Sequence, residues 1–165
     1  RMNVMNFYEV STYSEERNIL TRQKYTNHCP YFYFVGSLQK RKNLTNLFKA
    51  FDLFKHQTKS DVKLVIVGSK KWWKGEIEDT YNAMHFKNEV VFTGRLPLEE
   101  VNKIASASIG LVFVSYFEGF GVPPLEAYRS STASRFTSIA SDCTTAFLES
   151  LTIGPVTASR SISAR

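Results

Sequence analysis

The sequence predicts an α/β fold in which helices cover both faces of a parallel sheet. Four short apolar runs, each about as long as a buried strand, occupy residues 31–36, 63–68, 89–94 and 109–115. Segments with helical spacing of apolar residues separate these runs. This alternation is typical of strands that are joined in parallel by helical crossovers.

Glycine marks the end of three of the predicted strands, at Gly36, Gly68 and Gly94. In open parallel sheets, ligands bind in the crevice beyond the carboxyl ends of the strands. The residues that follow these glycines are therefore the first candidates for a functional site.

The predicted helices follow from the spacing of apolar residues. Asn43 can cap the first helix. The apolar face of that helix consists of Leu44, Leu47, Phe48, Phe51 and Phe54. The second helix carries Ile77, Tyr81 and Met84. The third begins at Pro97, with Val101, Ile104 and Ala105 inward, and a fourth begins at Pro123, because proline suits the first helical turn.

The two ends of the chain depart from this pattern. Residues 1–30 show no clear periodicity, and we expect them to be a connector from an amino-terminal domain that this chain lacks. The pattern requires another buried strand near 132–140, but the sequence there is a poor one. We interpret residues 130–165 as an atypical Ser/Thr-rich tail, better explained by a frameshift than by a native low-complexity segment. This interpretation leaves the last strand and the closing helix of the domain open.

Composition excludes several classes of protein. The 165 residues are 43% hydrophobic and 14% aromatic, which fits one folded domain and argues against intrinsic disorder. Two cysteines, Cys29 and Cys143, are too few for a disulfide scaffold. Neither a membrane-spanning run nor the apolar segment of a signal peptide is found. We therefore expect a cytoplasmic location, with the inner face of the membrane as a further position for the full enzyme.

Positive charge is concentrated between Lys40 and Lys74, where ten basic residues accompany only two acidic ones. We assign three of the lysines to a solvated helix face: Lys49, Lys55 and Lys59. The triplet at residues 40–42 differs, because it lies between the first strand and its helix. A cation beside a helix amino terminus favours anion binding, so Lys42 is predicted to face a phosphate.

The segment EGFGVPPLEA, residues 118–127, follows the fourth strand and leads into a helix. Gly119 and Gly121 let the backbone approach a ligand, and their N–H groups can point at an anion or a sugar oxygen. Glu118 and Glu126 supply hydroxyl acceptors, which suit a polyhydroxylated group such as ribose or hexose.

Four segments, in this order, resemble the carboxyl-terminal half of glycosyltransferase family four: FVGSLQKRKNL, LVIVGSKKWW, VVFTGRL and SYFEGFGVPPLEA. The resemblance covers about residues 28–129. The spacing from Glu118 to Glu126 is similar to the two-glutamate motif of that family, and residues 41–43 are similar to its phosphate-binding segment. Such enzymes have the GT-B architecture of two Rossmann-like domains. The resemblance therefore implies a Rossmann-like donor-binding domain over residues 31–129, mannosyltransferase-like in character.

The resemblance also implies roles for individual residues. Glu118 would accept hydrogen bonds from the donor sugar, while Arg41 and Lys42 would neutralise the donor diphosphate. The other donor-binding residues would be Gly36, Ser37, Arg95, Gly119, Phe120, Gly121 and Glu126. Many members carry a basic residue where this chain has Ser37, and Arg41 is the candidate to replace it.

The function implied is transfer of a hexose, with retention of configuration, from a UDP- or GDP-sugar to a glycan or lipid-linked acceptor in polysaccharide biosynthesis. The resemblance implies no metal and no cofactor, and His28, His56 and His85 are too scattered for a metal site. The acceptor would bind the missing amino-terminal domain, and peripheral membrane association is compatible with that role. We expect this chain alone to have little or no transferase activity.

Three alternatives remain at this point. A nucleic-acid-binding module would use Lys70, Lys71, Trp72, Trp73 and Lys74, since basic and aromatic residues together bind single strands. A noncatalytic nucleotide-binding fragment would keep the fold without the chemistry. Glycoside hydrolysis would use the two glutamates, although their position beside cations fits a diphosphate better. The sequence favours a nucleotide-sugar ligand over nucleic acid, and it does not identify the sugar or the base.

Overall fold

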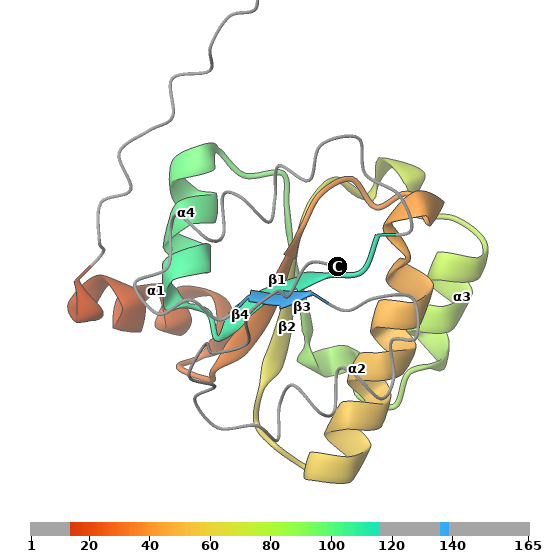
Figure 1. The fold of residues 1–165 in the computed structure, drawn as a ribbon, viewed down its shortest axis with the longest axis horizontal. Helices are drawn as coiled ribbons and strands as arrows, with labels where there is room; N and C mark the ends of the chain where they lie inside the picture. The colour runs from red at the N-terminus through yellow and green to blue at the C-terminus, as the bar shows by residue number, and fades with distance from the viewer. Residues whose placement is uncertain (1–13, 116–135, 139–165) are drawn as a thin grey trace, which may run out of the picture.

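The computed structural model describes residues 14–115 and 136–138. Within these residues, five parallel strands form one sheet in the order β3-β2-β1-β4-β5 (Figure 1). The strands are β1 (Tyr31–Val35), β2 (Lys63–Val67), β3 (Val90–Gly94), β4 (Gly110–Phe113) and β5 (Phe136–Ser138). The predicted α/β class with a Rossmann-like parallel sheet is confirmed.

Helices pack on both faces of the sheet, as predicted (Figure 1). The four described α-helices are α1 (Glu15–Thr26), α2 (Leu44–Thr58), α3 (Glu76–Ala83) and α4 (Leu98–Ala107). Three short 3-10 turns are η1 (Lys40–Lys42), η2 (Lys70–Trp72) and η3 (Lys87–Glu89). α2 and α3 cover one face, and α1 and α4 cover the other. Within the described residues, no helix has the length and apolar character needed to cross a bilayer.

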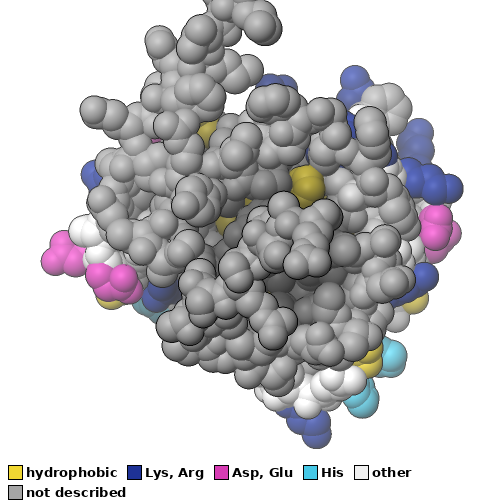
Figure 2. Space-filling model, viewed as in Figure 1, with side chains coloured by type: hydrophobic (Ala, Val, Ile, Leu, Met, Phe, Trp, Pro, Cys, Tyr) yellow, Lys and Arg dark blue, Asp and Glu magenta, His cyan; other side chains and the backbone are white. Residues whose placement is uncertain are grey.

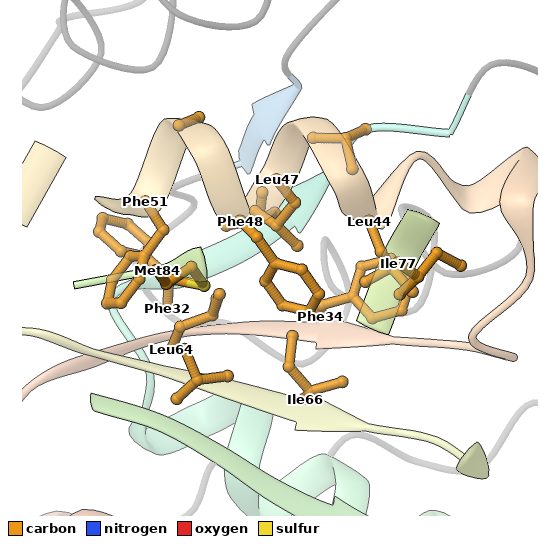
Figure 3. Close-up of a cluster of buried hydrophobic side chains, with 14 of the residues drawn as sticks. Phe32, Phe34, Leu44, Leu47, Phe48, Phe51, Leu64, Ile66, Ile77 and Met84 are labelled. Carbon is orange, nitrogen blue, oxygen red and sulfur yellow. The ribbon is translucent and has the colours of Figure 1, made fainter. Parts of the chain in front are cut away.

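The larger core lies between the sheet and the helix pair α2 and α3. Alternate strand residues point to this face, because side chains along a strand alternate between its two sides. Figure 3 shows strand residues Phe32, Phe34, Leu64 and Ile66 grouped with the apolar face of α2. All the α2 residues predicted for that face are buried.

The opposite face of the sheet carries a second core, which α4 covers. Tyr31 is fully buried there, and its hydroxyl donates a hydrogen bond to the carbonyl oxygen of Ile104 at 2.8 Å. Burial raises the pKa of the Tyr31 phenol, so it stays neutral and remains a donor. The strand residues that point to this face, Tyr31 among them, therefore fix α4 against the sheet.

The sequence analysis found no element in residues 1–30, yet Glu15–Thr26 form helix α1, which packs beside α4. The buried residues of α1 are Thr21 and Thr26. Their hydroxyls donate to carbonyl oxygens one turn earlier, at 2.8 Å and 3.0 Å. Because α1 buries threonines rather than aliphatic residues, it lacks the apolar periodicity that predicted the other helices. A connector role for residues 1–30 stays a prediction.

The strand expected near 132–140 is present at the edge of the sheet as β5. It pairs in parallel with β4, with Phe136 opposite Leu111 and Ser138 opposite Phe113. The sheet is therefore extended beyond β4 despite the poor strand pattern. The closing helix and the rest of the 130–165 tail lie outside the described residues.

The assignment of Lys55 to a solvated helix face was wrong. Lys55 is 4% exposed, and its ammonium donates to the carbonyl oxygens of Ser60 and Val62, the latter at 3.1 Å. It therefore secures the loop between α2 and β2. Lys49 and Lys59 are exposed, as predicted.

Candidate functional site

The order of the strands identifies the place where a ligand crevice is expected. The chain builds β1, β2 and β3 outward in one direction, then returns to place β4 on the other side of β1. The carboxyl ends of β1 and β4 therefore form the topological switch point of the sheet. In open parallel sheets, a switch point of this kind is where ligands bind.

Lys42 is held at this switch point by the shape of the loop after β1. A Cβ built on Gly36 would lie 3.5 Å from the Cε of Lys42 and 3.7 Å from its ammonium nitrogen. The Lys42 side chain therefore folds back over the end of β1, and Lys42 is only 5% exposed. This arrangement places a cation where the sequence analysis predicted a phosphate-facing residue.

Glycine is required where the ends of β1 and β2 touch. A Cβ on Gly68 would lie 1.9 Å from the carbonyl oxygen of Gly36, closer than any side chain permits. Backbone N–H groups link the three strand ends, because Gly36 donates to Val67 and Gly68 donates to Gly94, both at 2.9 Å. The three glycines therefore build one continuous rim along the carboxyl edge of the sheet.

Asn43 occupies the predicted cap position of α2 but does not cap the helix with its side chain. Its backbone has a left-handed φ of 57°, and its Nδ2 donates to the carbonyl oxygen of Val114 at 3.0 Å. Two buried side-chain oxygens at this place, Oδ1 of Asn43 and Oγ of Ser115, have no hydrogen-bond partner in the part of the chain that the structure describes. Asn43 belongs to the segment predicted to bind phosphate, but its contact with Val114 and the position of Ser115 were not predicted, because β4 is distant in the chain.

The other predicted site residues are distributed along the same edge. Ser37 is half-buried directly after Gly36. Arg41 is exposed, and its Nε donates to the side chain of Gln39 at 3.1 Å. Arg95 follows β3, so it lies two strands, or about 10 Å, from the end of β1.

The structure therefore brings together Gly36, Ser37, Arg41 and Lys42, and it places Arg95 apart from them. The predicted residues after β4 lie outside the described residues: Glu118, Gly119, Phe120, Gly121 and Glu126.

Two residues of the segment considered for nucleic-acid binding, Lys70 and Trp73, contact aromatic side chains of the fold. Trp73 packs against Phe48, Tyr81 and Phe92, with ring centroids 5.1–5.9 Å apart. The Lys70 ammonium lies 3.8 Å from the ring centroid of Phe92. Figure 2 shows several Lys and Arg side chains toward the right-hand edge of the view and a few others at the left and bottom. Because Trp73 is partly buried and its ring packs against the core cluster, it is poorly placed to stack on a base.

The described residues contain no group of three or more His, Cys, Asp or Glu side chains that are close enough to hold a metal ion. His85 instead pairs with Asp52, with 3.2 Å between Nδ1 and Oδ2. The backbone N–H of Phe86 donates to the other carboxylate oxygen at 2.9 Å. Asp52 therefore connects α2 to the turn before β3, which is a structural role.

A protein-family model agrees with this geometry. The model described as "Glycosyl transferases group 1" matches residues 17–146, which include the five strands and the switch point. The chain belongs to this family. The sequence analysis predicted this family from the segments after β1, β2, β3 and β4.

The curated proteins similar to this chain include mannosyltransferases. O-antigen chain mannosyltransferase B of Escherichia coli is 27% identical over 97 residues, which are 59% of this chain and 26% of that protein. O-antigen chain mannosyltransferase RfbU of Salmonella typhimurium is 28% identical over 102 residues, 62% of this chain and 28% of that protein. The chain thus spans about a quarter of the length of these relatives.

Solved structures of glycosyltransferases share the fold. The carboxyl-terminal domain of a group 1 family protein, LpcC of Francisella tularensis, has a TM-score of 0.60 and 23% identity, covering 78% of this chain and 67% of that one. WaaG, a glycosyltransferase involved in lipopolysaccharide biosynthesis, has a TM-score of 0.66 and 18% identity, and the match covers 88% of this chain and 44% of that one. Anabaena HepE, in complex with UDP and glucose, has a TM-score of 0.62 and 17% identity, and the match covers 78% of this chain and 33% of that one.

Proposed function

We propose that this chain supplies the donor-binding half of a retaining hexosyltransferase that uses a nucleoside diphosphate sugar. The observation that carries the proposal is the Lys42 side chain, folded over the end of β1 at the switch point of the sheet. A buried cation beside the start of α2 is suited to a diphosphate. Membership in the group 1 family supports the same chemistry.

The proposed chemistry depends on charge at the leaving group. When the bond between the anomeric carbon and the diphosphate breaks, the bonding electrons leave negative charge on the diphosphate. Lys42 and Arg41 stabilise that charge, and N–H dipoles at the loop after β1 add to the effect. We propose that these groups act without a metal cofactor. Glu118 and Glu126 hold the sugar and the ribose in this proposal, as the family resemblance implies.

Relatives support the class of donor. Two neighbouring structures are described with UDP and glucose and with UDP-2-fluoro glucose. The curated relatives are mannosyltransferases that act on O-antigen chains. We therefore propose mannose as the sugar, a glycan or lipid-linked acceptor, and a cytoplasmic site of action at the inner face of the membrane.

A thermal-shift titration with UDP, GDP and ADP tests the proposed site. We expect one nucleotide to raise the melting temperature in a saturable manner, because a ligand that binds only the folded state stabilises it. The shift should be much smaller in Lys42→Ala and in Glu126→Ala, and kept in Lys49→Ala, which changes an exposed lysine of α2. A cooperative melt that none of the three nucleotides shifts would rule out a donor site in this chain.

A further inference from the structure

Asn43 connects three parts of the carboxyl edge of the sheet. Its backbone N–H donates to the carbonyl oxygen of Lys40 at 3.0 Å, which closes η1. Its carbonyl oxygen accepts from the N–H of Leu47 at 3.2 Å, which begins α2. Its side-chain amide reaches the carbonyl oxygen of Val114, 71 positions away, just after β4. A single residue therefore joins the loop after β1 to the end of β4.

The stability of the fold does not by itself explain an asparagine at position 43. The left-handed backbone there, with φ 57° and ψ 33°, suits glycine at least as well. Asn43 is 2% exposed, and its Oδ1 has no hydrogen-bond partner among the described residues. A buried acceptor without a partner is unfavourable, because its interaction with water is lost and not replaced. The distinctive contribution of this side chain is thus its link to β4.

We infer that Asn43 is a positioning residue that fixes the Lys42 ammonium at the switch point. Lys42 is adjacent in the chain, and its side chain lies against Gly36 at the end of β1. The hydrogen bond that the Asn43 side-chain amide donates to the carbonyl oxygen of Val114 sets the distance between this loop and the end of β4. Lys42 is thereby held at the end of β1, next to the loop that Asn43 links to β4, before any ligand arrives. The consequence for nucleotide affinity rests on the function proposed above.

Chemical labelling of the complete chain, with no nucleotide present, tests the link directly. Lys42 should react slowly with an acetylating reagent, because it is 5% exposed, whereas exposed Lys40 should react fast. In Asn43→Gly, which keeps the left-handed backbone, we expect the rate at Lys42 to rise severalfold while Lys40 is unchanged. Asn27→Gly is the matched control, since Asn27 is an exposed, left-handed asparagine at the end of α1. An unchanged Lys42 rate in Asn43→Gly would overturn the inference.

Calorimetric titration with UDP and GDP then measures the consequence. We expect Asn43→Gly to weaken binding about fivefold, the effect of one hydrogen bond, and Asn27→Gly to have no effect. The double variant Asn43→Gly, Lys42→Ala should bind no more weakly than Lys42→Ala alone, because Asn43 acts through Lys42. Additive losses would contradict the inference. If Lys42 labelling responds as expected but the unaltered chain binds neither nucleotide, the positioning role stands and the proposed function fails.

Discussion

At the residue scale, the carboxyl edge of the sheet depends on glycine, which has no side chain, at position 68. Gly68 lies so close to the carbonyl oxygen of Gly36 that a Cβ would approach it to 1.9 Å. Since the Cβ would meet a backbone oxygen rather than a flexible side chain, one of the two strand ends must move to accommodate the added Cβ. The same movement would shift the loop that carries Lys42.

Gly68→Ala is expected to destabilise the fold by about 2 kcal/mol, as overpacking typically does, and to weaken nucleotide binding as well. Urea unfolding measures the first effect and calorimetry the second. Gly75→Ala is the matched control, because nothing lies within 4 Å of a Cβ there although its φ of 61° is strained for alanine. Equal losses of nucleotide binding in the two variants would contradict the claim that contact with Gly36 shapes the site.

At the element scale, the buried Lys55 and the partly exposed Glu100 connect helices to their neighbours. Lys55 ties the end of α2 to the loop before β2. Glu100 ties α4 to α1, because it accepts hydrogen bonds from Lys24 at 2.8 Å and from Tyr25 at 2.9 Å. These links hold in place helices that lie on opposite faces of the sheet.

Lys55→Met should destabilise the chain by about 2 kcal/mol, because two carbonyl oxygens lose their donor in a part-buried place. Lys49→Met, on the exposed side of the same helix, should change stability little. The free energy of unfolding in urea gives both values. If the two variants are equally stable, the ammonium of Lys55 does not secure the loop.

The α1–α4 contact should respond to acid. Hydrogen bonds from Lys103, Lys24 and Tyr25 lower the pKa of Glu100 to about 2 from 4.5. A carboxylate whose folded pKa is lowered stabilises the fold above its unfolded pKa, and that stabilisation is lost as the pH falls from about 4.5 to about 2. The effect should be below about 1 kcal/mol, because solvent screens a partly exposed group.

Glu100→Gln should therefore weaken the dependence of the urea midpoint on pH between 4.5 and 2. The matched control is Glu99→Gln, whose exposed carboxylate contacts only Lys103 among the ion pairs of the described residues. A midpoint that falls as steeply in Glu100→Gln as in the unaltered chain would show that another group governs the acid response.

At the scale of the whole molecule, the centre of the sheet could be predicted because β1, β2 and β4 are largely buried and appear as continuous apolar runs. Helix α1 could not, since its buried residues are threonines that satisfy their hydroxyls within the helix. The Lys42 position followed from its place between strand and helix. The Asn43 link to β4 could not be predicted, because its partner is a backbone carbonyl 71 positions away. Local sequence patterns thus predicted the carboxyl edge of the sheet as the candidate site, and only the fold revealed the contact between Asn43 and Val114.

Hydrogen–deuterium exchange of the complete chain, with and without saturating UDP or GDP, tests most directly whether the ligand site is the switch point. We expect nucleotide-dependent protection in peptides that cover residues 36–43 and 110–115, at the ends of β1 and β4. We expect no change over residues 15–26, which form α1 on one face of the sheet. Protection confined to α1 and α4, or none with a nucleotide shown to bind, would contradict it.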